Sequence, residues 1–144
     1  MWTDPDVRRY LWDNRVIERD EARTVVQALL DTAASDDYGM WVLYKHDETE
    51  PIGFVALRAI EGTDEVELMY GLVRAAWGAG YATEAARAVL DYGFDQLELP
   101  RIWARTDPPN TASIRIIERL GMQSAENPGN ETIPIVAWVL NRPA

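Results

Sequence analysis

The sequence predicts an α/β fold, in which a mixed and mostly antiparallel sheet is flanked by helices. Three strand-like segments follow one another between residues 40 and 73, separated by polar turns, and this order is typical of an antiparallel meander. From residue 81 onward helices alternate with strands, which favours some parallel pairing. A Gly-x-Gly turn separates the two patterns. With 144 residues and 47% hydrophobic composition, the chain is expected to be a single domain, residues 1–144, with one core.

The first part of the chain is expected to be helical. Asp4 and Pro5 supply an N-cap and a first-turn proline for a short helix that ends near Asp13. Apolar side chains recur at helical spacing over residues 19–34, so an amphipathic helix with one buried face should follow. The strands of the meander then cover residues 40–46, 51–60 and 66–73, with a turn at 61–64.

The second part of the chain is expected to alternate between helix and strand. A helix covers residues 81–97, and a short strand follows at residues 101–106. Residues 110–120 form another helix, with Ile116, Ile117 and Leu120 on its buried side, and residues 132–140 form the last strand. No repeat, low-complexity tract or long linker interrupts this order.

The most informative segment is residues 77–85, which read Trp-Gly-Ala-Gly-Tyr-Ala-Thr-Glu-Ala. Glycines let a ligand approach the backbone closely, and the first N–H groups of a helix have no partner within it, so this turn predicts a pyrophosphate site. A dinucleotide-binding turn would need a third glycine where Thr83 stands, and a nucleotide P-loop would need a lysine in the turn, whereas the only lysine is Lys45. A different class of phosphate-bearing ligand is therefore expected.

A second signal follows at residues 110–122, which read Asn-Thr-Ala-Ser-Ile-Arg-Ile-Ile-Glu-Arg-Leu-Gly-Met. The turn and this segment, in this order and separation, resemble the GNAT superfamily of acyl-CoA-dependent N-acetyltransferases, and in particular the branch of the ribosomal-protein acetyltransferases RimJ and RimL. The resemblance implies a GNAT-like sheet, acetyl-CoA as cosubstrate and no metal. The cofactor-binding residues that it implies are Leu72, Val73, Gly78, Ala79, Gly80, Tyr81, Ala82, Thr83 and Asn110.

The sequence departs from this family in three places. The family's first strand is apparently absent, because the chain starts at what looks like the following helix. The strand before the turn reads Glu-Leu-Met-Tyr-Gly from Glu67, where the family often has Glu-Ile-Gly-Tyr-Trp, and Ala75 replaces a usual Gln or Arg. These changes bear on the acceptor side rather than on the cofactor. Since the sheet must open to admit the pantetheine arm, Gly71 is the predicted opening or bulge.

Acetyl transfer to an amine needs a polarised thioester carbonyl and a base for the amine's proton. Backbone N–H groups around Gly71 and Leu72 are the expected donors to the carbonyl oxygen. Glu67 is the predicted general base, and the family resemblance also places a glutamate there. The alternative is a structural ion pair of Glu67 with Arg58 or Arg105.

Ser113 is the predicted acid that protonates the leaving thiolate, because it lies in the inward-facing stripe of its helix and matches the family's serine. The alternative is that its hydroxyl only caps the helix or bonds a nearby carbonyl. Asn110 is the natural N-cap of the same helix, and the resemblance adds a contact to the cofactor arm. Glu84 is a rival for the base, although a carboxylate in a first helical turn has a structural reason to be there.

Composition excludes several classes of function. The chain has no cysteine, which rules out disulfides, thiolate metal sites and cysteine nucleophiles. A net charge of −10 argues against nucleic acid as a partner and favours a cationic acceptor, or simply a solvated acidic surface. No segment has the length and hydropathy of a targeting peptide or membrane span, so a cytoplasmic location with no membrane partner is expected.

The sequence therefore predicts transfer of an acetyl group from acetyl-CoA to a primary amine, on a protein N-terminus or a small molecule, by direct attack on the thioester. The alternatives are a CoA-binding sensor or pseudoenzyme without acceptor turnover, and a purely structural partner protein. A homodimer is also expected, because an exposed sheet edge and the apolar surface of Tyr10, Leu11, Trp12 and residues 133–140 need a cover. The rival is a monomer whose N-terminal helix covers that edge.

Overall fold

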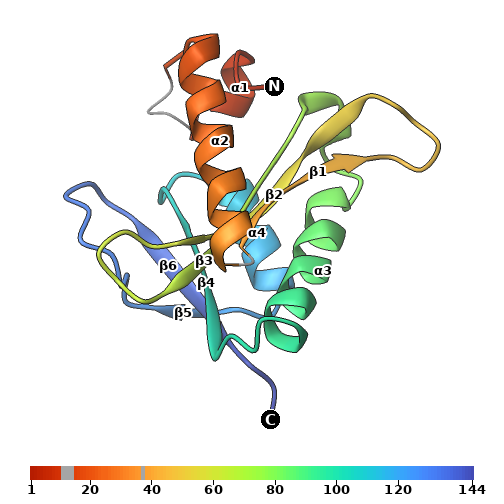
Figure 1. The fold of residues 1–144 in the computed structure, drawn as a ribbon. Coiled ribbons are helices and arrows are strands. Elements are labelled where there is room, and N and C mark those ends of the chain that lie inside the picture. Colours follow the sequence, from red (N-terminus) through yellow and green to blue (C-terminus); the bar gives the residue numbers. More distant parts are fainter. Residues whose placement is uncertain (11–14, 37) are drawn as a thin grey trace.

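The computed structural model describes residues 1–10, 15–36 and 38–144 (Figure 1). The elements are, in order, α1 (Pro5–Arg8), α2 (Arg19–Asp36), β1 (Gly39–Tyr44), β2 (Pro51–Ala59), β3 (Val66–Leu72), the 3₁₀ helix η2 (Arg74–Ala76), α3 (Tyr81–Asp95), β4 (Arg101–Thr106), α4 (Thr111–Arg119), β5 (Gln123–Ala125) and β6 (Val136–Asn141). None of the helices in these residues is long and apolar enough to cross a bilayer.

The described strands form one sheet in the order β1-β2-β3-β4-β6-β5. Neighbouring strands run antiparallel, except that β3 and β4 are parallel, with α3 as the crossover between them. The predicted α/β fold, with a mixed and mostly antiparallel sheet flanked by helices, is confirmed. As expected, no strand precedes β1 in the part of the chain that the structure describes.

The sheet opens between β3 and β4. Their parallel register ends with the pair Leu68 and Ala104, after which the described strands diverge, β3 continuing to Leu72 and β4 to Thr106. The carboxyl ends of the two strands are therefore free of each other. Crevices beyond the carboxyl ends of strands are common places for ligands in α/β sheets.

The predicted bulge at Gly71 is wrong. Gly71 stands opposite Phe54 in a β2–β3 register that runs without a shift from Val66 to Leu72. A Cβ atom on Gly71 would lie 2.8 Å from the Phe54 ring, so this glycine allows two neighbouring strands to pack closely. The opening comes instead from the divergence of β3 and β4 beyond Leu68.

The two faces of the sheet differ in character. α3 and α4 pack on one face, and the main core lies beneath them. Because side chains alternate along a strand, Leu68 and Tyr70 lie on this face and Glu67 lies on the opposite one. The buried core on the helical side includes Val55, Leu57, Val66, Leu68, Val89, Leu90, Phe94, Ile102, Ala104 and Ile117.

The N-terminal helices differ from the expectation. α1 ends at Arg8, residues 9 and 10 of the predicted helix form a turn instead, and residues 11–13 lie outside the described residues. Asp4 caps α1 as predicted, since its Oδ1 accepts a hydrogen bond from the backbone N–H of Asp6 at 2.9 Å. α2 packs against β1. Of the apolar side chains on its predicted buried face, Ala22, Val25 and Val26 are partly buried and Leu30 is 49% exposed, while the side chain of Leu29 lies outside the described ones.

The C-terminal strands also depart from the prediction. β5 is absent from the predicted elements, because a strand of three residues is too short to show an alternating pattern. β6 begins at Val136 rather than at residue 132, because Pro134, which has no N–H for a ladder, lies just before it.

Candidate active site

A pocket of about 600 Å³ lies at the opening of the sheet. Its walls are the end of β3, the loop that leads into α3, and the N-terminal turns of α3 and α4, with α1 beside them. The N-terminal segment contacts both sides of the opening. Asp6 Oδ2 pairs with Arg74 Nη1 after β3 at 2.5 Å, and the Tyr10 hydroxyl donates to the carbonyl of Pro109 after β4 at 3.2 Å.

The loop before α3 presents bare backbone to this pocket. Gly78 and Gly80 have φ angles of 76° and 83°, in the left-handed region that favours glycine. A Cβ atom on either residue would meet no described atom within 4 Å, so the space beside both is open. Gly80 is the N-cap of α3 and offers no side-chain acceptor to the first N–H groups of the helix. These N–H groups and the helix dipole suit an anionic group.

The start of α4 is fixed by its capping residue. Asn110 Oδ1 accepts a hydrogen bond from the backbone N–H of Ser113 at 3.3 Å, and Asn110 Nδ2 donates to Thr106 Oγ1, at the end of β4, at 2.9 Å. The predicted N-cap is therefore confirmed. The predicted contact of Asn110 with the cofactor arm stays a prediction.

Ser113 meets a tyrosine that the sequence analysis missed. Ser113 Oγ lies 2.8 Å from the phenol oxygen of Tyr70, and this phenol also lies within 3.3 Å of the Ser113 carbonyl oxygen. Burial raises the pKa of Tyr70 to about 12, and the hydrogen bond with Ser113 offsets only part of that effect. The phenol is therefore uncharged at physiological pH. The alternation along β3 places Tyr70 on the helical face, and that parity is the sequence signal for this contact.

The free end of β3 directs backbone groups into the opening. Val73 donates its N–H to β2 at 2.8 Å, and successive residues of a strand point their N–H groups in opposite directions. The N–H of Gly71 therefore faces β2, whereas the N–H groups of Tyr70 and Leu72 face the opening. Of the two donors predicted for the carbonyl oxygen, only Leu72 is oriented for that role. The Leu72 carbonyl accepts from Trp77 Nε1 at 3.1 Å.

Glu67 lies between two guanidinium groups. Its side chain is buried, its Oε1 accepts from Arg58 Nε at 2.7 Å, and its Oε2 accepts from Arg105 Nε at 2.7 Å. The structural ion pair that was the alternative for Glu67 is thus present, with both arginines. Glu67 lies on the sheet face opposite Tyr70 and outside the pocket lining. Its role as general base stays a prediction.

The ion pair of Glu67 with Arg105 continues to a second carboxylate, in the loop before β6. Arg105 Nη1 pairs with Glu131, and Asn127 Nδ2 donates to Glu131 Oε2 at 3.0 Å. Hydrogen bonds from Asn127 and then from Arg105 lower the pKa of Glu131 to about 2. The stability that Glu131 contributes is therefore complete above its ordinary pKa of 4.5 and is lost as the pH falls toward 2.

Residues 1–123 match the family model described as the acetyltransferase (GNAT) domain. The chain belongs to the GNAT acetyltransferase family. This GNAT chain is also 32% identical, over 123 residues, to an uncharacterized N-acetyltransferase named p20 from Bacillus licheniformis. The match covers 85% of this chain and 69% of that protein.

Solved structures show the same fold. An acetyltransferase from Agrobacterium tumefaciens has a TM-score of 0.84 at 22% identity, over 97% of this chain and 80% of that one. yncA, a putative acetyltransferase from Salmonella typhimurium solved with acetyl-CoA, has a TM-score of 0.73 at 16% identity, over 94% of this chain and 80% of that one. RimL, a ribosomal alpha-N-protein acetyltransferase in complex with coenzyme A, has a TM-score of 0.73 at 17% identity, over 91% of this chain and 77% of that one.

Most of the predicted site residues of this GNAT chain meet in the pocket. Its lining includes Leu72, Gly78, Gly80, Tyr81, Ala82, Thr83, Asn110 and Ser113. Val73, Ala79 and Glu67 lie outside the lining. The structure therefore brings together the two motifs that the sequence separates by about thirty residues, while the roles of these residues in binding and catalysis stay predictions.

The sequence analysis also missed the charge of the GNAT pocket. The charged side chains in its described lining are Asp6, Arg9, Arg115 and Arg119, and Asp6 is paired both with Arg9 and with Arg74. The pocket is therefore cationic, although the whole chain has a net charge of −10. The signal for this was the spacing of Arg115 and Arg119, which are four residues apart and so share a face of α4.

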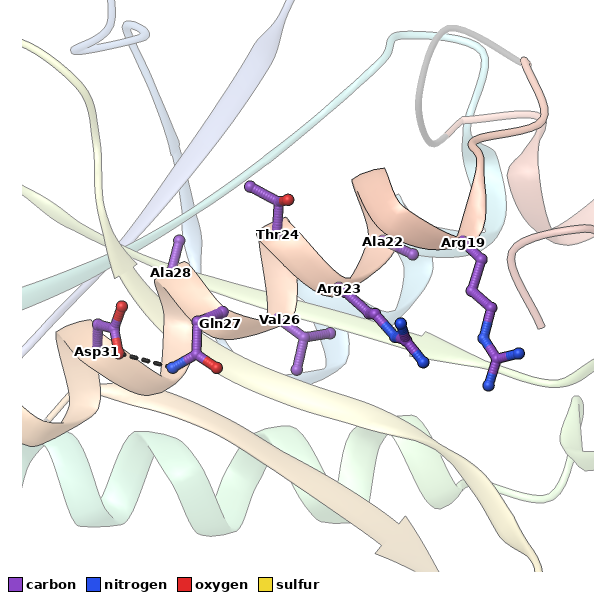
Figure 2. Close-up of a pocket in the computed structure, with 8 residues that line it drawn as sticks. All are labelled: Arg19, Ala22, Arg23, Thr24, Val26, Gln27, Ala28 and Asp31. Carbon is purple, nitrogen blue, oxygen red and sulfur yellow. Dashed lines mark hydrogen bonds between the residues drawn. The ribbon is translucent and has the colours of Figure 1, made fainter.

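A second hollow, of about 800 Å³, lies along α2 (Figure 2). All of its lining residues come from that one helix, and Gln27 Nε2 donates to Asp31 Oδ1 there at 2.8 Å. A single helix cannot surround a ligand, and the hollow contains no predicted site residue. The pocket at the sheet opening is therefore the candidate active site. Among the described residues, no group of His, Asp or Glu side chains is arranged to hold a metal ion.

The Glu67 ion pair leads to a prediction about stability. Glu67→Gln should lower the free energy of unfolding by about 2 kcal/mol, because it removes the buried negative charge between Arg58 and Arg105 and leaves the guanidinium of Arg105, whose side chain is only 9% exposed, with Glu131 as its remaining ion-pair partner. Urea unfolding followed by circular dichroism measures this loss. Glu61→Gln, at an exposed position in the turn before β3, is the matched control and should unfold as the wild type does. A Glu67→Gln variant as stable as the wild type would contradict the structural role.

Proposed function

We propose that this protein transfers an acetyl group from acetyl-CoA to a primary amine, on a protein N-terminus or a small molecule. The observation that carries the proposal is the loop over residues 78–83, which directs bare backbone and the N-terminus of α3 into the same pocket as Ser113. The cationic side chains of that pocket suit the phosphates of CoA. We also propose that the protein is related to the RimJ and RimL branch of the family, which the loop motif and the likeness to the RimL fold support.

The proposed reaction is a direct transfer. The neutral amine nitrogen attacks the thioester carbonyl carbon, so that a C–N bond forms, the C–S bond breaks, and its electron pair stays on sulfur. The ammonium form of the acceptor gives up one proton before attack, and the new amide nitrogen loses another. The thiolate takes up a proton to leave as the free thiol of CoA.

The residues at the opening suit the separate parts of this reaction. The N–H of Leu72, which faces the opening, is placed to donate to the carbonyl oxygen as negative charge develops on it. Ser113 is the proposed acid for the leaving thiolate, and it comes from the helical face of the sheet. Glu67, the proposed base, comes from the opposite face, so the acceptor amine would approach from there.

A CoA-binding sensor or pseudoenzyme is the second candidate. The observation that favours it is the Glu67 ion pair, because both carboxylate oxygens already accept hydrogen bonds from arginine. A carboxylate held in this way is poorly placed to take a proton from an acceptor. Turnover with amines separates the two candidates, since only the enzyme releases CoA thiol in their presence.

The loop supports a prediction about cofactor binding. Gly80→Asp should weaken acetyl-CoA binding by about 10² or more, because it places a negative charge where the phosphate oxygens approach the backbone. Isothermal titration calorimetry with acetyl-CoA measures the affinity.

Two controls isolate the effect of charge at this position. The asparagine of Gly80→Asn has the same size as aspartate and also tolerates the left-handed backbone, but it is uncharged. This variant should therefore bind acetyl-CoA more tightly than Gly80→Asp does. Gly62→Asp adds the same charge at a φ of 75°, at the other end of β3, and should bind acetyl-CoA as the wild type does. Equal affinity of Gly80→Asp and the wild type would overturn the cofactor assignment.

A second prediction concerns the rate of turnover. Ser113→Ala should lower kcat by about 10² with little change in the affinity for acetyl-CoA, if its hydroxyl protonates the leaving thiolate. Thiol release from acetyl-CoA is measured with a panel of primary amines, including polyamines and short peptides with free N-termini. A variant that loses stability but keeps its kcat would support the packing role of Ser113 instead.

We also propose a homodimer in which a second copy covers the edge of the sheet. β1 lies at one end of the strand order, and Trp41, Val42 and Tyr44 on it are 37%, 49% and 54% exposed. Such an edge presents unpaired backbone groups and apolar surface together. The described part of α1 lies beside the pocket, and Leu11 and Trp12, which the sequence analysis included in the apolar surface, lie outside the described residues.

The mass in solution tests this assembly. Light scattering at micromolar concentration should give twice the chain mass of 16.3 kDa. Val42→Lys, on the exposed edge, should dissociate the dimer, whereas Val16→Lys, at a similarly exposed position outside the strands, should not. A wild-type mass near 16.3 kDa would refute the dimer.

A further inference from the structure

Two hydroxyl groups meet across the opening of the sheet. Tyr70 belongs to the free end of β3 and Ser113 to the first turn of α4, and their side-chain oxygens are 2.8 Å apart. Both residues line the pocket. The contact joins the two sides of the opening at the position where the proposed acid lies.

Hydrogen bonds around Ser113 restrict the orientation of its hydroxyl group. The backbone N–H of Ser113 is held by Asn110 Oδ1, which fixes the start of α4. The phenol of Tyr70 has a single proton, and Ser113 Oγ at 2.8 Å is a closer acceptor for it than the Ser113 carbonyl at 3.3 Å. When the phenol donates to Ser113 Oγ, the proton of the serine hydroxyl remains free to point into the pocket.

We propose that Tyr70 is a positioning residue, which donates a hydrogen bond to Ser113 Oγ and thereby directs the serine hydroxyl toward the leaving sulfur of acetyl-CoA. This inference rests on the proposed function and assigns a new role within the same site. The bond from the phenol also makes the serine hydroxyl a stronger donor, because hydrogen bonds in a chain polarise one another. Tyr70 thus acts through Ser113 rather than on the substrate itself.

Burial raises the pKa of Tyr70 to about 12, so the phenol is protonated at neutral pH and can donate to Ser113 Oγ. The serine hydroxyl in turn donates to the leaving sulfur as the C–S bond breaks, and a proton that it gives up to the thiolate is replaced from solvent.

A double-mutant cycle in kcat tests the inference. Tyr70→Phe removes only the hydroxyl and should lower kcat by about tenfold, without changing the Kd for acetyl-CoA, since coupled neighbours interact by this order of free energy. In a Ser113→Ala background the same substitution should cause no further loss, because its effect acts through the serine hydroxyl. Tyr92→Phe makes the same change on a partly buried tyrosine of α3 outside the pocket, and should keep the wild-type kcat.

The assay uses thiol release from acetyl-CoA with the best amine of the panel, and calorimetry gives the Kd. A Tyr70→Phe variant with the wild-type kcat would overturn the inference while Ser113→Ala still loses activity, so the proposed function would stand. Additive losses in the double variant would also overturn it, because they mean that Tyr70 acts independently of Ser113. A wild-type protein that releases no thiol with any amine would overturn the proposed function, and the inference with it.

Discussion

The divergence of β3 and β4 after the pair Leu68 and Ala104 is the constraint on which the site depends. Past that pair, β3 has backbone donors with no partner on the neighbouring strand, and such groups need a ligand, water or another part of the chain. α3 and α4 start beside the same gap and add their own free N–H groups. A single irregularity in the sheet thus brings polar backbone groups of β3, α3 and α4 into one pocket.

Charge is distributed so that the pocket and the whole protein have opposite signs. The chain has a net charge of −10, whereas Arg9, Arg115 and Arg119 face the pocket. An anionic ligand is attracted by the local field of the pocket, and a cationic acceptor is attracted by the field of the whole molecule. Ser113 lies on the helical side of the sheet and the Glu67 ion pair on the other, so in the proposed reaction the cofactor and the acceptor would approach from opposite faces.

Local signals in the sequence were enough to predict most elements and the position of the loop. The glycines at 78 and 80 and the cap at Asn110 act within a few residues of chain, so their consequences are visible in the sequence itself. The contact of Tyr70 with Ser113 joins residues 43 positions apart, and it depends on how α4 packs across the sheet. The opening was predicted at Gly71, which does lie in the diverging part of β3 and lines the pocket. Its cause was predicted wrongly as a bulge, because strand divergence is a property of a pair and not of either strand.

The weak joint between β3 and β4 also has a consequence for how the molecule folds. β1, β2 and β3 form one antiparallel unit of short-range pairings, whereas the β4–β6 ladder, like the β3–β4 ladder, joins residues that are 30 or more positions apart. The parallel ladder between β3 and β4 is short and closes only after residues 73–100, including α3, are in place. Contacts of long sequence separation carry the largest entropy cost of loop closure. The β1–β3 meander is therefore expected to form first. The β3–β4 seam, which is also the pocket, has only two paired positions and should exchange its amide hydrogens sooner than the longer ladders on either side.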